Sequence, residues 1–235
     1  MIRQLPLSPP PVHRETVGSF LGRLADANRL KPHTLPELLG ISTLPRHADP
    51  KNPWPPVAVT TLAILTGRDP AVLLAALPAL ALPSPGTPPA DPGRIRPACR
   101  SCMATHGIAS TVIQHTADHE DVCLRHHRWL AAPEQYPLDH LPDVLSANRR
   151  HRSLARQAGP ALADAHRDAR TVVTAWFTAA DQPELLDRWI RRLEAIPEDP
   201  FGHPGHPSPQ RIALALYPEA VALTADYLAS RRTRA

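Results

Sequence analysis

Hydrophobic residues recur with helical spacing near the start of the chain. The residues that share one helix face are Val17, Phe20, Leu21, Leu24 and Ala25. This helix is expected to open at Glu15 and to end near Asn28, and a shorter helix follows with Thr34 as its N-cap and Gly40 just past its end. The pattern predicts a helical hairpin over residues 1–50, for which a packing role and a recognition role are both open.

Two further apolar segments, 57–65 and 71–80, flank a short turn. Asp69 is placed to cap the second helix, and Pro70 is placed at its first position. The arrangement is typical of a helix-turn-helix and predicts a module over residues 53–82. Its second helix carries almost no polar or basic side chains, so packing or protein contact is expected of it rather than direct reading of bases.

Beyond residue 136 the hydrophobic pattern is helical throughout. It predicts helices over 143–157, 161–179, 182–195 and 211–230. The second and third of these should pack as a hairpin, with Trp176 and Trp189 in the core rather than exposed as stacking surfaces. Ser208 followed by Pro209 is a favourable start for the last helix. Residues 136–235 are therefore predicted to form a C-terminal helical domain.

The high proline content limits the length of the predicted helices. The 235 residues include 30 prolines, about twice the usual share, so many short helices are expected. The run 83–93, PSPGTPPADPG, is predicted to be a linker. A chain of this length can hold one ordinary domain or two to three small ones. The predicted fold class is mostly α, with small helical modules joined by a zinc-ribbon or knuckle segment that has little β structure, followed by a C-terminal helical bundle.

The three cysteines of the chain all lie in one stretch, together with a histidine at matching spacing. Cys99 and Cys102 form a C-x2-C pair, and Cys123 and His126 form a C-x2-H pair twenty residues later. Such a set of four donors matches the tetrahedral shell that Zn2+ prefers in structural sites. Residues 94–132 are therefore predicted to be a zinc-binding knuckle. An ion there can join two segments that would otherwise have to close a long loop.

The fourth ligand has several candidates in the sequence. His126 is favoured because its spacing from Cys123 repeats the spacing of the first pair, and the other candidates by sequence are His127, His106, His115 and His119. The competing interpretation is three buried free cysteines with scattered surface histidines. Disulfides are disfavoured because the number of cysteines is odd and no secretion signal is present.

Known catalytic metal motifs do not fit this stretch. Zinc deaminases need H-x-E before P-C-x-x-C, and metalloproteases need H-E-x-x-H on a helix. Here His119 and Glu120 follow the C-x2-C pair, and position 123 is a cysteine. Four protein ligands leave no open coordination position, so the metal is expected to be structural. We expect the protein not to be an enzyme.

Arginines gather in the first helix of the C-terminal domain. The cluster consists of Arg149, Arg150, Arg152 and Arg156, within a chain of formal net charge +4 and pI near 9.3. Each of these arginines is a candidate contact to a nucleic-acid phosphate that carries no sequence information. A solvated helix whose arginine stems cover Leu145 and Leu154 is the equally weighted alternative.

From the sequence we expect no secretion signal and no membrane-spanning segment. The first residues lack the apolar run and small-residue cleavage site of a secretion signal. The most apolar stretch, 71–82, is broken by Pro78 and falls short of the roughly 20 residues of a spanning helix. A cytoplasmic location without membrane contact is the expectation, and a reducing compartment suits thiolate ligands.

The order of these motifs resembles the TniQ family of transposition proteins. The matching segments are Pro9 to Pro11, Glu15 to Ala25, Leu62 to Pro70, the set Cys99, Cys102, Cys123 and His126, and the run from Val144 to Leu154. The resemblance covers about residues 7 to 157, and it depends on the order of the motifs rather than on any one of them.

The resemblance implies a non-enzymatic accessory of DNA transposition. Proteins of this family act as adaptors between a target-recognition device, in some elements an RNA-guided complex, and the transposition machinery. The implied partners are a transposase, an AAA+ ATPase or a target-recognition complex, with weak DNA contact and, in some relatives, a homodimer. By position, Cys99, Cys102, Cys123 and His126 would be the metal ligands. The alternative function is a zinc-stabilised helix-turn-helix regulator that binds DNA.

Overall fold

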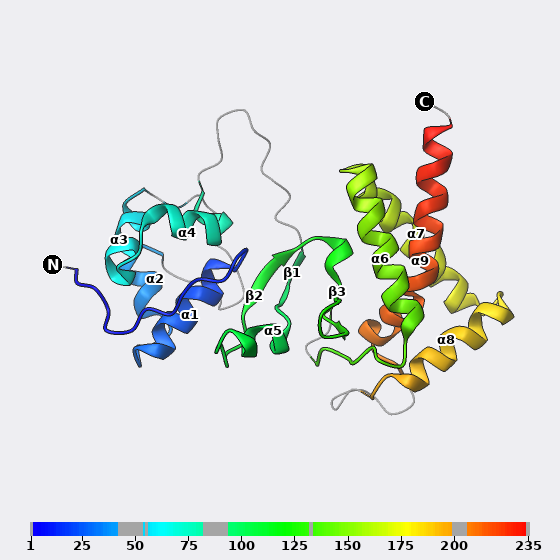
Figure 1. The fold of residues 1–235 in the computed structure, drawn as a ribbon, viewed down its shortest axis with the longest axis horizontal. Helices are drawn as coiled ribbons and strands as arrows, with labels where there is room; N and C mark the ends of the chain where they lie inside the picture. Colours follow the sequence, from blue (N-terminus) through cyan, green and yellow to red (C-terminus); the bar gives the residue numbers. More distant parts are fainter. Residues whose placement is uncertain are drawn as a thin grey trace. The chain divides into compact units, whose positions relative to one another are not determined.

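A computed structural model describes residues 2–41, 54, 56–81, 94–131, 134–198 and 206–233 (Figure 1). Within these residues the protein is mostly helical, with nine α-helices and two short two-stranded sheets. The predicted fold class is confirmed. The chain divides into two compact units, Met1–Thr116 and Ala117–Ala235. The predicted linker 83–93 lies outside the described residues.

The first unit contains five α-helices and one of the two-stranded sheets. Its elements are α1 Val17–Ala27, α2 Thr34–Leu38, α3 Pro56–Thr66, α4 Pro70–Ala76, β1 Arg94–Pro97, α5 Arg100–Thr105 and β2 Ile113–Thr116, with a 3-10 turn at Pro78–Leu80. Strands β1 and β2 pair antiparallel, with Ile95 opposite His115. Small elements of this kind are what a proline-rich sequence predicts.

One hydrophobic core is shared by α1, α2, α3 and α4. It contains Phe20 and Leu24 from α1, Leu35 from α2, Leu62 from α3 and Leu73 from α4, all fully buried. The two modules that the sequence predicted at 1–50 and 53–82 therefore pack on each other. Neither amphipathic pair is large enough to bury its apolar face alone, so a common core is the physical solution.

The turn between α3 and α4 has the geometry of a helix-turn-helix. Residues 67–69 join the two helices, whose direction changes by 103° across the turn. Gly67 adopts a φ of 64°, a left-handed conformation that costs glycine little. Asp69 caps α4 by accepting a hydrogen bond from the Ala71 amide at 2.7 Å, and Pro70 opens the helix. The predicted cap and turn are confirmed.

Two predicted helix starts differ from the structure. Helix α1 begins at Val17, with Thr16 as the N-cap whose Oγ1 accepts from the Ser19 amide at 3.2 Å. Helix α2 begins at Thr34 itself, so the prediction of Thr34 as an N-cap was wrong, and the cap residue His33 makes no side-chain capping bond. The period of the apolar residues locates a helix well but fixes its first residue poorly.

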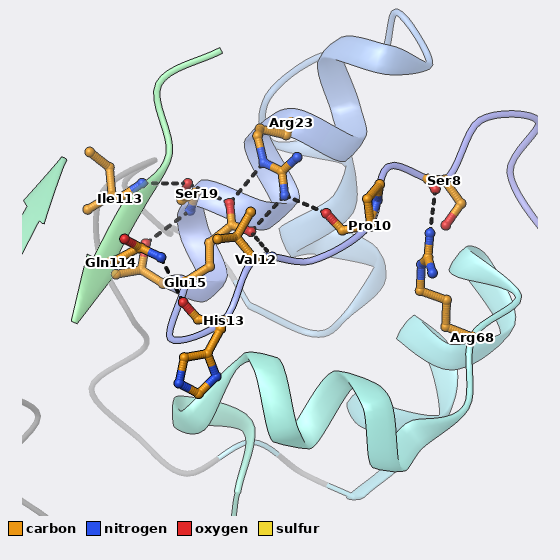
Figure 2. Close-up of polar contacts among 11 residues, drawn as sticks. Ser8, Pro10, Val12, His13, Glu15, Ser19, Arg23, Arg68, Ile113 and Gln114 are labelled. Carbon is orange, nitrogen blue, oxygen red and sulfur yellow. Dashed lines mark hydrogen bonds and ion pairs between the residues drawn. The ribbon is translucent and has the colours of Figure 1, made fainter. Parts of the chain in front are cut away.

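Glu15 precedes the N-cap of α1 and belongs to a buried ion pair (Figure 2). Arg23 Nε donates to Glu15 Oε1 at 2.9 Å, and Arg23 Nη2 donates to Glu15 Oε2 at 2.7 Å and to the Pro10 carbonyl at 2.8 Å. Ser19 Oγ donates to Glu15 Oε1 at 2.8 Å and accepts from the Ile113 amide of β2 at 3.0 Å. This network joins the N-terminal segment, α1 and β2 within the first unit.

The second unit is a small hairpin followed by four helices. Its elements are a 3-10 turn at Asp118–Glu120, β3 Val122–Cys123, β4 Arg128–Trp129, α6 Pro142–Ala158, α7 Ala161–Ala179, α8 Pro183–Ala195 and α9 Pro209–Arg232. Strands β3 and β4 pair antiparallel, with Val122 opposite Trp129. The four predicted C-terminal helices are present, and Ser208 Oγ caps α9 by accepting from the Arg211 amide at 3.3 Å.

Helix α9 is the core helix of this unit. It packs against α6, α7 and α8, and Leu214 and Val221 are fully buried on it. The contact between α7 and α8 joins Phe177 to the buried Trp189, with ring centroids 5.7 Å apart. The stretch Pro209–Arg231 is long and apolar enough to cross a membrane, as are α3 and α4 taken together. In α9 this apolar character is explained by packing, since three helices cover it.

Candidate metal centre

The four predicted ligands lie on two short turns. Cys99 is the N-cap residue of α5 and Cys102 lies in the first turn of that helix, so a separation of three residues brings both side chains to one side. Cys123 ends β3, and His126 lies in the turn that leads to β4. Each C-x2 spacing therefore becomes a tight turn that presents two donors together.

The donor atoms of these four residues all lie within 4.8 Å of one another. Cys123 Sγ is 3.6 Å from His126 Nδ1. A tetrahedral zinc ion with ordinary bond lengths separates a sulfur and a nitrogen ligand by about 3.6 Å, and two sulfurs by about 3.8 Å. Cys99 is 6% exposed and the other three residues are half-buried. The residues fit a metal ion in both chemistry and spacing.

Three thiolates and one imidazole match Zn2+ well, although this donor set suits other thiophilic ions too. The residues that would hold the ion are Cys99, Cys102, Cys123 and His126. All four tetrahedral positions would be filled by protein, which leaves none for water or substrate. The chemistry available to such a site is to stabilise the fold of the chain around it.

Local packing supports the first pair of ligands. Cys102 contacts an apolar cluster that includes Ala98, Met103 and Val112. The Met103 amide donates to the Cys99 carbonyl at 3.0 Å, and Thr105 Oγ1 donates to the Cys102 carbonyl at 2.7 Å. These contacts fix the backbone of the turn that carries both sulfurs.

The other candidate histidines lie elsewhere. His127 has a φ of 44°, and its Nδ1 is 3.2 Å from Asp139 Oδ1. His115 is buried on β2, and His106 is exposed at the end of α5. His119 lies edge-on to His151, with ring centroids 6.2 Å apart. The structure therefore selects His126, as the spacing predicted.

The predicted arginine cluster divides into two kinds of residue. Arg149, Arg150 and Arg156 are exposed on α6. Arg152 is half-buried, where its Nε donates to Asn148 Oδ1 at 3.1 Å and its Nη2 donates to the Val122 carbonyl at 3.1 Å. Arg152 therefore joins α6 to β3, and three of the four predicted residues face solvent.

A buried polar seam between α6, α7 and α9 was not predicted. The Tyr217 hydroxyl accepts from Asn148 Nδ2 at 2.8 Å and lies 3.0 Å from His151 Nδ1. His166 Nδ1 lies 3.0 Å from Thr224 Oγ1, and the rings of His151 and His166 are 4.2 Å apart. The signal in the sequence is a polar residue every three to four positions along the otherwise apolar face of α6.

His151 is held neutral in this seam. Burial lowers its pKa from 6.5 to about 3, because the charged imidazolium would lose its hydration, and repulsion from His166 and His119 adds to the effect. Its Nε2 atom is buried without a hydrogen-bond partner among the described residues. The neutral imidazole therefore belongs to the folded state.

A second charge network joins α6, α8 and α9. Arg192 Nη1 donates to Glu219 Oε2 at 2.6 Å, and its Nε donates to Asp143 Oδ2 at 2.6 Å. Trp189 Nε1 also donates to Glu219 Oε2, at 3.0 Å. Burial by itself lowers the pKa of Arg192, but hydrogen bonds and attraction to Glu219 and Asp143 outweigh it and raise that pKa.

No protein-family model, no curated protein and no solved structure matches this chain.

Proposed function

We propose that this protein is a non-enzymatic accessory of DNA transposition of the TniQ kind, in which a structural zinc ion stabilises the chain. The observation that carries the proposal is the convergence of Cys99, Cys102, Cys123 and His126. The order of elements along the chain agrees with the resemblance, since the helix-turn-helix precedes the metal ligands and a helical domain follows them. In this role the protein contacts a transposase, an AAA+ ATPase or a target-recognition complex in the cytoplasm.

The character of α4 supports a protein-binding adaptor. In a helix-turn-helix that reads bases, the second helix presents polar or basic side chains to the major groove. The exposed residues of α4 are Pro70, Ala71, Val72 and Ala75, which offer no hydrogen-bonding side chain. Val72 is 49% exposed, which suits contact with an apolar protein surface.

The alternative is a zinc-stabilised regulator that binds DNA. The 103° turn between α3 and α4 favours it, because this is the angle of DNA-binding helix-turn-helix motifs. The two functions differ in what they recognise. A regulator holds one DNA sequence over random competitor at moderate salt, whereas an adaptor binds DNA weakly, with steep salt dependence, and needs a protein partner.

The test first asks whether a transposase and an AAA+ ATPase are encoded beside this protein, and then co-purifies the tagged full chain with them. We expect at least one of them to be retained, and Val72→Asp to reduce that retention because it places a charge on the apolar surface of α4. Thr60→Asp, an exposed change on α3, is the matched control. Retention of neither partner, together with tight binding to one DNA sequence, would replace the adaptor by the regulator.

A further inference from the structure

The solvent face of α6 carries an unusual concentration of positive charge. Residues 144–163 contain four arginines and no aspartate or glutamate, so this run of twenty residues has a formal charge of +4, as large as that of the whole chain. The carboxylates that flank this run in the sequence are Asp143, which binds Arg192, and Asp164, which binds Arg167. Both carboxylates therefore pair with arginines outside α6.

The exposed arginines of α6 form a stripe along one side of the helix. The exposed residues are Ser146, Arg149, Arg150, Arg156 and Gln157, with Ser153 half-exposed between them. At 100° per residue these positions cover about 120° of the helix circumference. Arg149 and Arg156 are separated by about 10 Å along the helix axis, a length that spans about three phosphates of one DNA strand.

Three exposed arginines elsewhere in the same unit lie close to carboxylates. Arg167 pairs with Asp164 at 2.8 Å, Arg188 with Glu219 at 3.9 Å and Arg231 with Asp168 at 3.7 Å. Among the residues that the structure describes, none of the three stripe arginines, Arg149, Arg150 and Arg156, makes an ion pair. Three arginines on one side of the helix, without a carboxylate partner among the described residues, give that side a positive potential.

The composition of the stripe distinguishes between polyanionic partners. None of the large hydrophobic residues exposed in the described structure lies on α6. A protein interface is built around an apolar or aromatic centre, and a membrane-surface helix needs an apolar face to enter the lipid. A nucleic-acid backbone needs only positive charge and hydrogen-bond donors, which arginine, serine and glutamine supply.

We propose that Arg149, Arg150 and Arg156 of α6 form a binding stripe for the phosphate backbone of duplex DNA, without recognition of bases. The inference rests on the proposed role of the protein at DNA and identifies the surface that makes the contact. Arg152 is excluded from the stripe because it holds Asn148 and Val122. The stripe fixes the C-terminal unit on DNA while sequence selection is left to a partner.

The experiment measures binding of the full chain to a fluorescent 30-base-pair duplex of mixed sequence over a range of salt concentrations. The triple variant Arg149→Gln, Arg150→Gln, Arg156→Gln should reduce the slope of log affinity against log salt by about three, or about one per phosphate contact. At low salt its affinity should fall by tenfold or more. The matched control is Arg167→Gln, Arg188→Gln, Arg231→Gln, which removes the same charge from paired arginines and should change the slope by less than one.

Several results would overturn the inference. The first is an equal loss of DNA affinity in both triple variants, and the second is an unchanged salt slope in the α6 variant. The third is wild-type binding to polyglutamate or to phosphatidylserine vesicles that is as tight as its binding to DNA. The helical circular dichroism of both variants shows whether they fold. Co-purification with the transposition partners is measured on the same α6 variant. If the α6 variant loses DNA binding but the wild type retains no partner, the adaptor role alone is defeated. If partners are retained but the salt slope of the α6 variant is unchanged, the stripe alone is defeated.

Discussion

Single residues in the first unit make buried polar contacts that the composition does not reveal. Glu15 and Arg23 are 0% and 6% exposed, and together they bond Pro10, Ser19 and one another. A buried ion pair contributes little net stability compared with an apolar replacement of both partners, but loss of one partner leaves a charge without compensation. The pair therefore matters because each member requires the other.

We predict that Glu15→Gln destabilises the protein by about 3 kcal/mol or more, because the Arg23 guanidinium stays buried without a counter-charge. Urea unfolding at pH 7 measures the change. The control is Asp164→Asn, which breaks the exposed pair with Arg167 and should change stability by less than about 1 kcal/mol. A similar decrease in the free energy of unfolding in both variants would show that burial of the Glu15 pair does not contribute to stability.

At the scale of elements, the polar seam determines how α6, α7 and α9 meet. Tyr217 and Thr224 are seven residues apart on α9, so they present their hydroxyl groups on one face to His151 and His166. Such hydrogen bonds are satisfied at one helix register, whereas apolar contacts tolerate several. The seam also makes the bundle sensitive to acid, because His151 is neutral when folded.

We predict that acid destabilises the C-terminal unit through His151. Its pKa is about 3 when folded and near 6.5 when unfolded, so the unfolded chain binds the extra proton. The stabilising contribution is fully present above pH 6.5 and is lost as the pH falls toward 3, by about 1.4 kcal/mol per pH unit. The groups that face His151 are Asp118 and His119 from the 3-10 turn, His166 from α7 and Tyr217 from α9.

Urea unfolding at pH 7, 6 and 5 tests this dependence. Between pH 7 and pH 5, the free energy of unfolding should fall less in His151→Gln than in wild type. The difference is the contribution of the one proton that His151 binds in the unfolded chain, and it is expected even if the variant is less stable at pH 7. His206→Gln, a change at an exposed histidine, should keep the wild-type dependence. Identical pH dependence in all three proteins would assign the acid sensitivity to other groups.

At the scale of the whole molecule, two units of about 115 to 120 residues each must be stable with modest cores. The Cys3His cluster offers a contribution that a small core cannot make, since an ion bound by the folded chain stabilises it by mass action. Four donors within 4.8 Å of one another are already placed for the ion. The stability of the protein should therefore depend on free metal.

We predict about one zinc ion per chain in the wild type and a clear loss of zinc in Cys102→Ser. With free zinc at one hundred times its dissociation constant, binding adds about 2.7 kcal/mol, so EDTA should lower the Tm by about 5 to 10 °C. The Tm of Cys102→Ser should hardly respond to EDTA. Ser101→Ala, at the neighbouring position, serves as the control and should behave as wild type. Equal zinc content in wild type and Cys102→Ser would remove the assigned site.

The sequence by itself determined the helical character of the chain, the caps of two helices and the four residues that could hold a metal ion. These follow from short-range rules: apolar spacing gives α7 within its observed bounds, Asp69 and Ser208 cap the helices that follow them, and the C-x2-C and C-x2-H spacings each form one turn. The choice of His126 over His127 also followed from local spacing.

Only the tertiary structure decided which long-range partners these elements take. The sharing of one core by α1 to α4, the pairing of Glu15 with Arg23 and the seam around His151 join residues whose contacts depend on how helices pack. The same holds for Arg152, which sequence grouped with Arg149 and which packing turned toward Val122. Periodicity assigns a residue to a helix face, but burial and hydrogen bonding depend on what the fold brings to that face.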